Sequence, residues 1–126
     1  YEIREVVSWA RMCIRDSNKA AILTVGSGHG ACVEAIDRLK AQNVNLNYCR
    51  VRGFPFNDDV KDFIDKHEVV YVVEQNRDAQ LRALLMLDID ADQRKLVSLL
   101  HYNGMPLNAG FVVSRVLEEV ARGRAA

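Results

Sequence analysis

The sequence predicts an α/β domain of three layers (α/β/α), in which a mainly parallel sheet of about four strands lies between two layers of helices. Short apolar runs alternate along the chain with segments whose apolar residues recur at helical spacing. Short loops join them, and this alternation requires parallel strands connected by right-handed crossovers. The length of 126 residues fits one core, so we expect residues 1–126 to form a single domain.

The first half of the chain is predicted to form two helices and two strands. Residues 1–17 form a leading segment whose helical spacing of apolar residues is clearest over 3–14. The apolar run at 20–25 ends in glycines and predicts a buried strand. A helix that stops near residues 42–43 and a strand at 44–51 follow.

The second half is predicted to alternate in the same way. Asn57 is a plausible N-cap for a helix ending near residue 67, because Asp58 and Asp59 place negative charge at the positive end of the helix dipole. The strand at 69–73 is apolar on both faces, as in a central parallel strand. The remaining elements are a helix at 79–89, a strand at 96–100, a last helix capped by Asn108 and a frayed tail at 122–126.

The simplest doubly wound order for four such strands is 2-1-3-4, and it places the switch point between the first and third strands. Ligands of such folds bind beyond the carboxyl ends of those two strands. Here these ends carry a glycine turn and a polar segment. The candidate structural or crevice residues are Gly26, Ser27, Gly28, Glu74, Asn76 and Gln80.

The glycine turn leaves two interpretations open. Gly26-x-Gly28-x-x-Ala31 fits a loose dinucleotide fingerprint, but the second strand ends without a carboxylate to hold a ribose. A phosphate-binding loop would need a Lys-Ser/Thr pair, and a hydrolase elbow would need serine where Gly28 stands. The glycines therefore either only supply a tight turn, or bind a nucleotide or another anion. We expect no catalytic, cofactor-binding or metal residue in this chain.

Two interpretations also apply to the segment after the third strand. Glu74 and its neighbours either cap the next helix and bind nearby backbone, or line a crevice or subunit boundary. Because the first and third strands are neighbours, we further expect Glu74 to accept backbone N–H groups of residues 27–30. Asn76 and Gln80 would then close the loop after the third strand.

Composition excludes several classes of protein. Lys plus Arg and Asp plus Glu are 17 each, so the net charge is 0, which argues against nucleic-acid binding. The longest uncharged stretch is too short to span a membrane, and no secretory signal opens the chain. Three cysteines without a close pair argue against a disulfide scaffold, a zinc site or an iron–sulfur cluster held by this chain. We expect a cytoplasmic protein, and the first residue, Tyr1, indicates a fragment of a longer chain.

Three segments together resemble a known family. They are Val51-Arg52-Gly53-Phe54-Pro55-Phe56, Val72-Val73-Glu74-Gln75-Asn76-Arg77-Asp78-Ala79-Gln80-Leu81 and His101-Tyr102-Asn103-Gly104-Met105-Pro106-Leu107. They are similar to the carboxyl-terminal part of the alpha subunit of 2-oxoacid:ferredoxin oxidoreductases, most closely the 2-oxoglutarate type. That part is core domain II, a transketolase-C-terminal-like domain. The resemblance runs from about Lys19 to Val120, and its most specific part is the Glu-x-Asn-x-x-x-Gln pattern.

The resemblance implies a parent enzyme that oxidatively decarboxylates a 2-oxoacid with coenzyme A, giving an acyl-coenzyme A, carbon dioxide and reduced ferredoxin. Thiamine diphosphate with Mg²⁺ and [4Fe-4S] clusters would serve the parent complex. The family's Gly-Asp-Gly diphosphate motif lies on another subunit and is absent here, as are grouped cysteines.

The chain is thus expected to be inactive alone and to serve as a packing and assembly domain. Its partners would be the pyrimidine-binding domain of the same parent chain and the beta subunit. His29 departs from the pattern, which favours a smaller or hydroxylated residue there.

Two other functions remain open from the sequence. One is a stand-alone nucleotide- or anion-binding α/β module. The other is the carboxyl-terminal domain of a different thiamine enzyme, such as a transketolase or a 2-oxoacid dehydrogenase beta subunit. The packing role also predicts an exposed apolar face for partners, to which Trp9, Phe54 and Phe56 would contribute.

Overall fold

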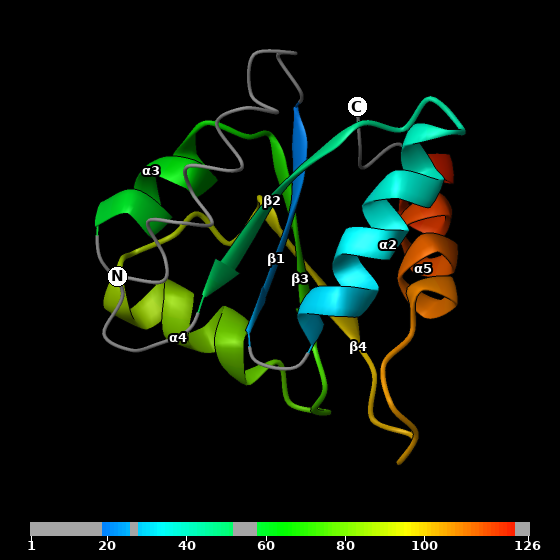
Figure 1. Cartoon of the computed structure of the whole chain (residues 1–126). Helices are drawn as coiled ribbons and strands as arrows, with labels where there is room; N and C mark the ends of the chain where they lie inside the picture. Colours follow the sequence, from blue (N-terminus) through cyan, green and yellow to red (C-terminus); the bar gives the residue numbers. More distant parts are fainter. Residues whose placement is uncertain (1–18, 26–27, 52–57, 123–126) are drawn as a thin grey trace.

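The computed structural model describes residues 19–25, 28–51 and 58–122. The elements follow the predicted alternation (Figure 1). In chain order they are β1 (Ala20–Val25), α2 (His29–Lys40), β2 (Leu46–Val51), α3 (Asp58–Asp65), β3 (Val69–Glu74), α4 (Gln80–Asp88), β4 (Leu96–Leu100) and α5 (Ala109–Ala121). The leading helix, the Asn57 cap and the aromatic residues Trp9, Phe54 and Phe56 lie outside the described residues, as does the tail beyond Arg122.

The four strands form one sheet in the order β2-β1-β3-β4, and every neighbouring pair is parallel. Leu23 of β1 lies opposite Cys49 of β2 and Val72 of β3, and Val72 lies opposite Ser98 of β4. The predicted three-layer α/β class and the order 2-1-3-4 are confirmed. The switch point therefore lies between β1 and β3, at the carboxyl edge of the sheet.

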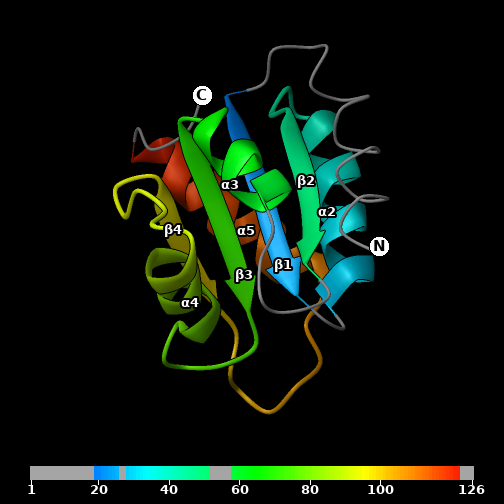
Figure 2. The ribbon, with the colours of Figure 1, turned by 90° about the vertical axis from the view of Figure 1, so that its left-hand side faces the viewer.

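Helices cover both faces of the sheet, with α3 and α4 on one side and α2 and α5 on the other (Figure 2). Side chains alternate between the faces because strand side chains repeat every two residues. Ala21 and Leu23 of β1 pack with the residues of α3 and α4, whereas Ala20 and Ile22 pack with those of α2 and α5. The core thus consists of two apolar clusters, one on each face of the sheet.

The element boundaries differ from the predicted ones at a few positions. The helix after β1 ends at Lys40, and Asn43 takes a left-handed φ of 64° in the turn that follows, so β2 starts at Leu46. The predicted cap of the last helix is confirmed, because Asn108 Oδ1 accepts the N–H of Phe111 at 2.9 Å. Among the helices that the structure describes, none has the length and apolar character that a membrane span requires.

Candidate functional site

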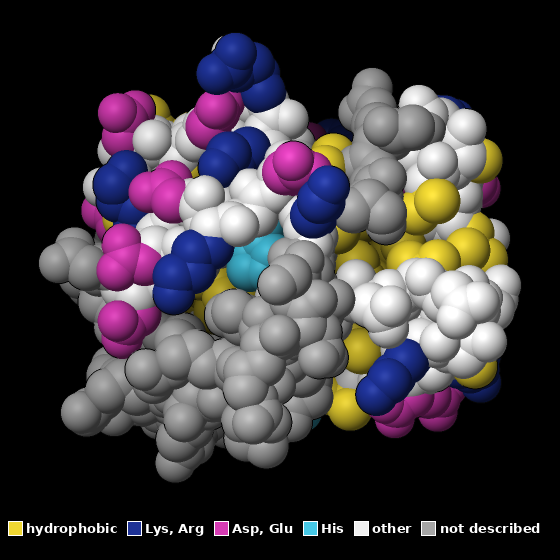
Figure 3. All heavy atoms as spheres, turned by 90° about the horizontal axis from the view of Figure 1, so that it is seen from above, with side chains coloured by type: hydrophobic (Ala, Val, Ile, Leu, Met, Phe, Trp, Pro, Cys, Tyr) yellow, Lys and Arg dark blue, Asp and Glu magenta, His cyan; other side chains and the backbone are white. Residues whose placement is uncertain are grey.

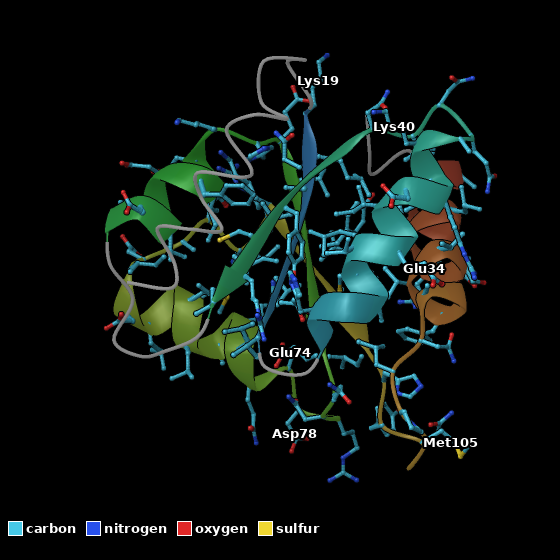
Figure 4. All side chains as sticks on the ribbon, in the orientation of Figure 1. Lys19, Glu34, Lys40, Glu74, Asp78 and Met105 are labelled. Atoms are coloured by element: carbon cyan, nitrogen blue, oxygen red, sulfur yellow. The ribbon has the colours of Figure 1, made fainter. Side chains whose placement is uncertain are left out.

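The candidate residues lie at the carboxyl edge of the sheet. Figure 4 places Glu74, Asp78 and Met105 at this end of the molecule, and Lys19 and Lys40 at the opposite end. The edge comprises the end of β1, the start of α2, the loop after β3 and the loop 101–108 before α5. Gly26 and Ser27, two of the candidates, lie outside the described residues.

Gly28 is required by a close approach of side chains. A Cβ at this position would lie 2.8 Å from Thr24 Oγ1 and 3.1 Å from Leu107 Cδ2. Its φ of −74° is ordinary, so the constraint is space and not backbone conformation. Gly30, by contrast, has no atom within 4 Å of such a Cβ. Packing therefore explains Gly28, whereas it places no constraint on Gly30.

Thr24 joins the two strands of the switch point. Its Oγ1 donates to the backbone carbonyl of Val73 at 3.1 Å, and the side chain is buried. Burial raises the pKa of the nearby Cys32 thiol to about 12, and a hydrogen bond with Thr24 lowers that pKa in part. Cys32 is therefore a protonated core residue at neutral pH and not a nucleophile.

Glu74 caps the amino end of α4. The residue is 2% exposed, its Oε1 accepts the N–H of Leu81 at 2.6 Å, and its Oε2 accepts the N–H of Arg82 at 3.2 Å. Ala79 occupies the N-cap position and has no side chain that could serve as a cap. A carboxylate from the end of β3 replaces it and also places negative charge at the positive end of the helix dipole.

Asn76 completes the same arrangement. Its Nδ2 donates to Glu74 Oε1 at 2.9 Å, and its Oδ1 accepts the N–H groups of Asp78 at 3.1 Å and Gln80 at 3.3 Å. The N–H groups of the first three residues of α4, which have no partner inside the helix, are thus all bound. Ala79 holds a left-handed φ of 53° within this loop. Gln80 contributes its backbone N–H, and its side chain is exposed.

We expected Glu74 to accept backbone N–H groups of the glycine turn. For the residues of that turn that the structure describes, Gly28–Gly30, this prediction is wrong. The hydrogen bonds of the carboxylate go to Asn76 and the start of α4 instead. The reason is strand parity: Val73 packs with the cluster of α2 and α5, so Glu74 points to the other face, where α4 lies. The glycine turn leads into α2, on the opposite face. Counting residues along the third predicted strand would have indicated this.

His29, which departs from the family pattern, pairs with a buried tyrosine. Its Nδ1 lies 2.7 Å from Tyr48 Oη, and the two ring centroids are 5.4 Å apart. Burial is the largest cause that raises the pKa of Tyr48 well above its ordinary value, so the hydroxyl stays protonated. The imidazole therefore satisfies a buried hydroxyl of β2 from the first turn of α2.

The described residues do not gather ligands for a metal. Across residues 19–25, 28–51 and 58–122, no three His, Cys, Asp or Glu side chains come together. Cys32 belongs to the cluster of α2 and α5, and Cys49 to that of α3 and α4, so the sheet separates them. Burial raises the pKa of both thiols to about 12, with the charge of Asp59 also raising that of Cys49. These two cysteines do not fit an iron–sulfur cluster.

The described surface also offers exposed apolar side chains at the carboxyl edge. Tyr102 is 60% exposed and Met105 66% exposed, in the loop before α5, where Gly104 takes a φ of 84°. Their sequence neighbours are Pro106, a glycine and polar residues, so no periodic pattern could have singled them out. At the amino edge, Figure 3 shows acidic and basic side chains interspersed on the side of α3 and α4.

The chain is similar to two solved structures. The first is a 2-oxoglutarate:ferredoxin oxidoreductase from Magnetococcus marinus with 2-oxoglutarate, coenzyme A and succinyl-CoA bound. The TM-score is 0.72 at 25% sequence identity, over 82% of this chain and 18% of that chain. The second is the alpha chain of a probable 2-oxoacid ferredoxin oxidoreductase from Thermoplasma acidophilum. Here the TM-score is 0.55 at 24% identity, over 82% of this chain and 90% of that chain.

These similarities confirm the resemblance that the three sequence segments indicated. No protein-family model matches the chain. No curated protein matches it either. The chain spans only 18% of the Magnetococcus marinus protein, so that protein's own activity belongs to a much larger polypeptide.

Proposed function

We propose that the chain is a non-catalytic packing and assembly domain in the alpha subunit of a thiamine-diphosphate-dependent 2-oxoacid:ferredoxin oxidoreductase. Its parent would oxidatively decarboxylate a 2-oxoacid with coenzyme A, and the resemblance of the sequence favours 2-oxoglutarate as that acid. The observation that carries this proposal is the similarity to 18% of the Magnetococcus marinus oxidoreductase chain at a TM-score of 0.72. A domain that corresponds to 18% of that chain leaves most of the enzyme to other parts of the complex.

The use of the polar groups at the switch point supports a structural role. Glu74 and Asn76 bind backbone N–H groups of α4 and each other, and Thr24 binds the β3 backbone. A general base or a diphosphate-binding group needs lone pairs or donors that face the substrate. Here the same groups stabilise the edge of the sheet.

The cofactors of the parent complex would lie on other parts of it. Thiamine diphosphate with Mg²⁺ supplies a carbanion-stabilising ylid when it is bound. The chain lacks the Gly-Asp-Gly motif, and the described residues hold no cluster of metal ligands. The described residues therefore do not fit thiamine diphosphate or a [4Fe-4S] cluster, and the chemistry of the reaction would belong to other parts of the complex.

The partners would contact the carboxyl edge. Tyr102 and Met105 are exposed there, and aromatic residues and methionine are enriched at interfaces between proteins. The pyrimidine-binding domain of the same parent chain is the first candidate, with the beta subunit beside it. Ferredoxin and coenzyme A would be partners of the whole complex.

Affinity purification from the source cells tests this function. An antibody raised against the chain should recover polypeptides that bind thiamine diphosphate and carry iron–sulfur clusters. The recovered material should reduce ferredoxin or methyl viologen with coenzyme A and a 2-oxoacid, and 2-oxoglutarate should be compared with pyruvate. Recovery of the chain alone, with affinity for ATP or NAD, would instead favour the nucleotide-binding module. Recovery of a transketolase or a lipoyl-linked dehydrogenase would favour another thiamine enzyme.

A further inference from the structure

A buried histidine at the amino edge of the sheet links three elements, and neither the sequence motifs nor the proposed function uses it. His67 lies in the turn between α3 and β3 and is 2% exposed. Its Nδ1 lies 2.6 Å from the carbonyl oxygen of Phe63, in α3. Its Nε2 lies 2.8 Å from Nδ2 of Asn47, which is fully buried in β2.

The partners fix the protonation of the ring. A carbonyl oxygen can only accept a hydrogen bond, so Nδ1 must carry the proton that points to Phe63. In the neutral imidazole the other nitrogen then has a lone pair, and it accepts the N–H of the Asn47 amide. Both ring nitrogens are thus bound in a geometry that suits the neutral Nδ1–H tautomer.

The surroundings oppose a charge on this ring. The groups that face it are neutral on the β2 side, where Asn47 lies, and on the α3 side, where the Phe63 ring centroid is 4.6 Å away. The charged groups that act on it are the ammoniums of Lys66 and Lys95, and the carboxylate of Asp65 pairs with Lys61. Burial is the largest cause that lowers the pKa of His67, and the two lysines lower it further, although the bond to Phe63 acts in the opposite direction.

We propose that the Asn47–His67–Phe63 chain is an acid-sensitive latch that holds strand β2 to the α3–β3 turn. When Nε2 gains a proton, its N–H faces the N–H₂ of Asn47, so two donors meet. The contact then breaks, or the amide must turn over and give up the orientation that it holds in the buried site. Since β2 is an outer strand of the described sheet and pairs there with β1, the bond from Asn47 adds a link between β2 and the α3–β3 turn that the ladder does not supply. Acidification loosens the β2–α3 side of the domain.

The direction of the pH dependence follows from the protonation of His67 in the folded and the unfolded chain. Well above pH 6.5 the ring is neutral in the folded and the unfolded chain, and the latch contributes fully. As the pH falls below that value, the unfolded chain binds the proton first, so the folding equilibrium constant decreases by up to about tenfold per pH unit. The decrease stops when the pH passes the lowered pKa of the folded state.

Urea unfolding of the full chain between pH 7.5 and 5.0 tests the latch, with His67→Asn as the matched variant. The asparagine amide keeps a donor for the Phe63 carbonyl but does not titrate, while His29 and His101 remain in both proteins. The wild-type folding constant should fall more steeply with acid than that of the variant, by up to about tenfold per pH unit. In an Asn47→Asp variant the folding constant should instead rise with acid relative to that of His67→Asn, because a carboxylate accepts the N–H of the charged ring. Equal pH profiles for wild type and His67→Asn overturn the proposal.

Nitrogen NMR of the imidazole side chains keeps the test decisive if a variant does not fold. The wild type should show His67 as the Nδ1–H tautomer with a titration midpoint below 6.5. The backbone amides of β2 should exchange faster as His67 titrates, whereas those of β3 should not. An Nε2–H tautomer, or a midpoint at or above 6.5, overturns the proposal without any substitution.

Discussion

Glu74 and Leu81 are joined across seven residues by a hydrogen bond of 2.6 Å, from the backbone N–H of the helix to the carboxylate of the strand. The bond ties the end of β3 to the start of α4, on the face of the sheet opposite α2. Arg82 adds a second N–H to the other carboxylate oxygen at 3.2 Å. The most specific motif of the sequence is thus a device that ends a strand and starts a helix.

Glu74→Gln should therefore destabilise the domain. The amide keeps one acceptor oxygen, but its N–H₂ group faces a backbone donor and the charge at the helix dipole is lost. We expect a loss of about 1–2 kcal/mol in the free energy of unfolding, measured with urea at pH 7. Glu118→Gln is the control, because Glu118 pairs with Arg115 on the surface of α5. Equal stability of the two variants would contradict the capping role.

Gly28→Ala and Gly30→Ala form a matched pair in the glycine turn. The added methyl group at position 28 meets Thr24 Oγ1 and Leu107 Cδ2, so a loss of about 1–3 kcal/mol is expected. At position 30 the methyl group has open space within α2, and alanine is the better helix former, so stability should rise by up to about 1 kcal/mol. Thermal unfolding followed by circular dichroism measures both. If Gly28→Ala is as stable as the wild type, the close approach does not explain that glycine.

Cys32 and Cys49 should resist alkylation in the folded chain. With both pKa values at about 12, only about one thiol in ten thousand is ionised at pH 8, and the core shields it further. Iodoacetamide labelling, read at each cysteine by peptide mass spectrometry, should be slow without denaturant and fast in urea. Rapid labelling of either cysteine in the native chain would show that its part of the core opens readily.

The chain alone should bind no thiamine diphosphate. Calorimetric titration with thiamine diphosphate and Mg²⁺ should give no heat of specific binding, because no diphosphate motif is present. A titration with ATP under the same conditions is the matched arm, since the glycine turn is the feature that a nucleotide would use. A micromolar dissociation constant for thiamine diphosphate would contradict the packing role, and one for ATP would favour the binding module.

The positions of the elements and the order of the strands could be predicted from the sequence. Apolar periodicity is a local property, and it fixed each strand to within about two residues. The alternation of strands and helices then left 2-1-3-4 as the simplest order, because crossovers are right-handed. The cap at Asn108 was also local, since its partner Phe111 is three residues away. The apolar face expected from Trp9, Phe54 and Phe56 stays a prediction.

The sequence left more than one partner open for Glu74 and indicated none for His67, and the tertiary structure decided both. Glu74 binds residues seven and eight positions ahead, because the face of β3 on which it lies is the face that α4 covers. His67 meets Asn47 across twenty residues, because the sheet places the α3–β3 turn beside β2. Both sets of hydrogen bonds follow from which helix covers each face of the sheet and which strands are neighbours in it. Sequence determines where a chain becomes strand or helix through local periodicity, but a buried hydrogen bond requires two segments in contact, and that contact exists only in the folded sheet.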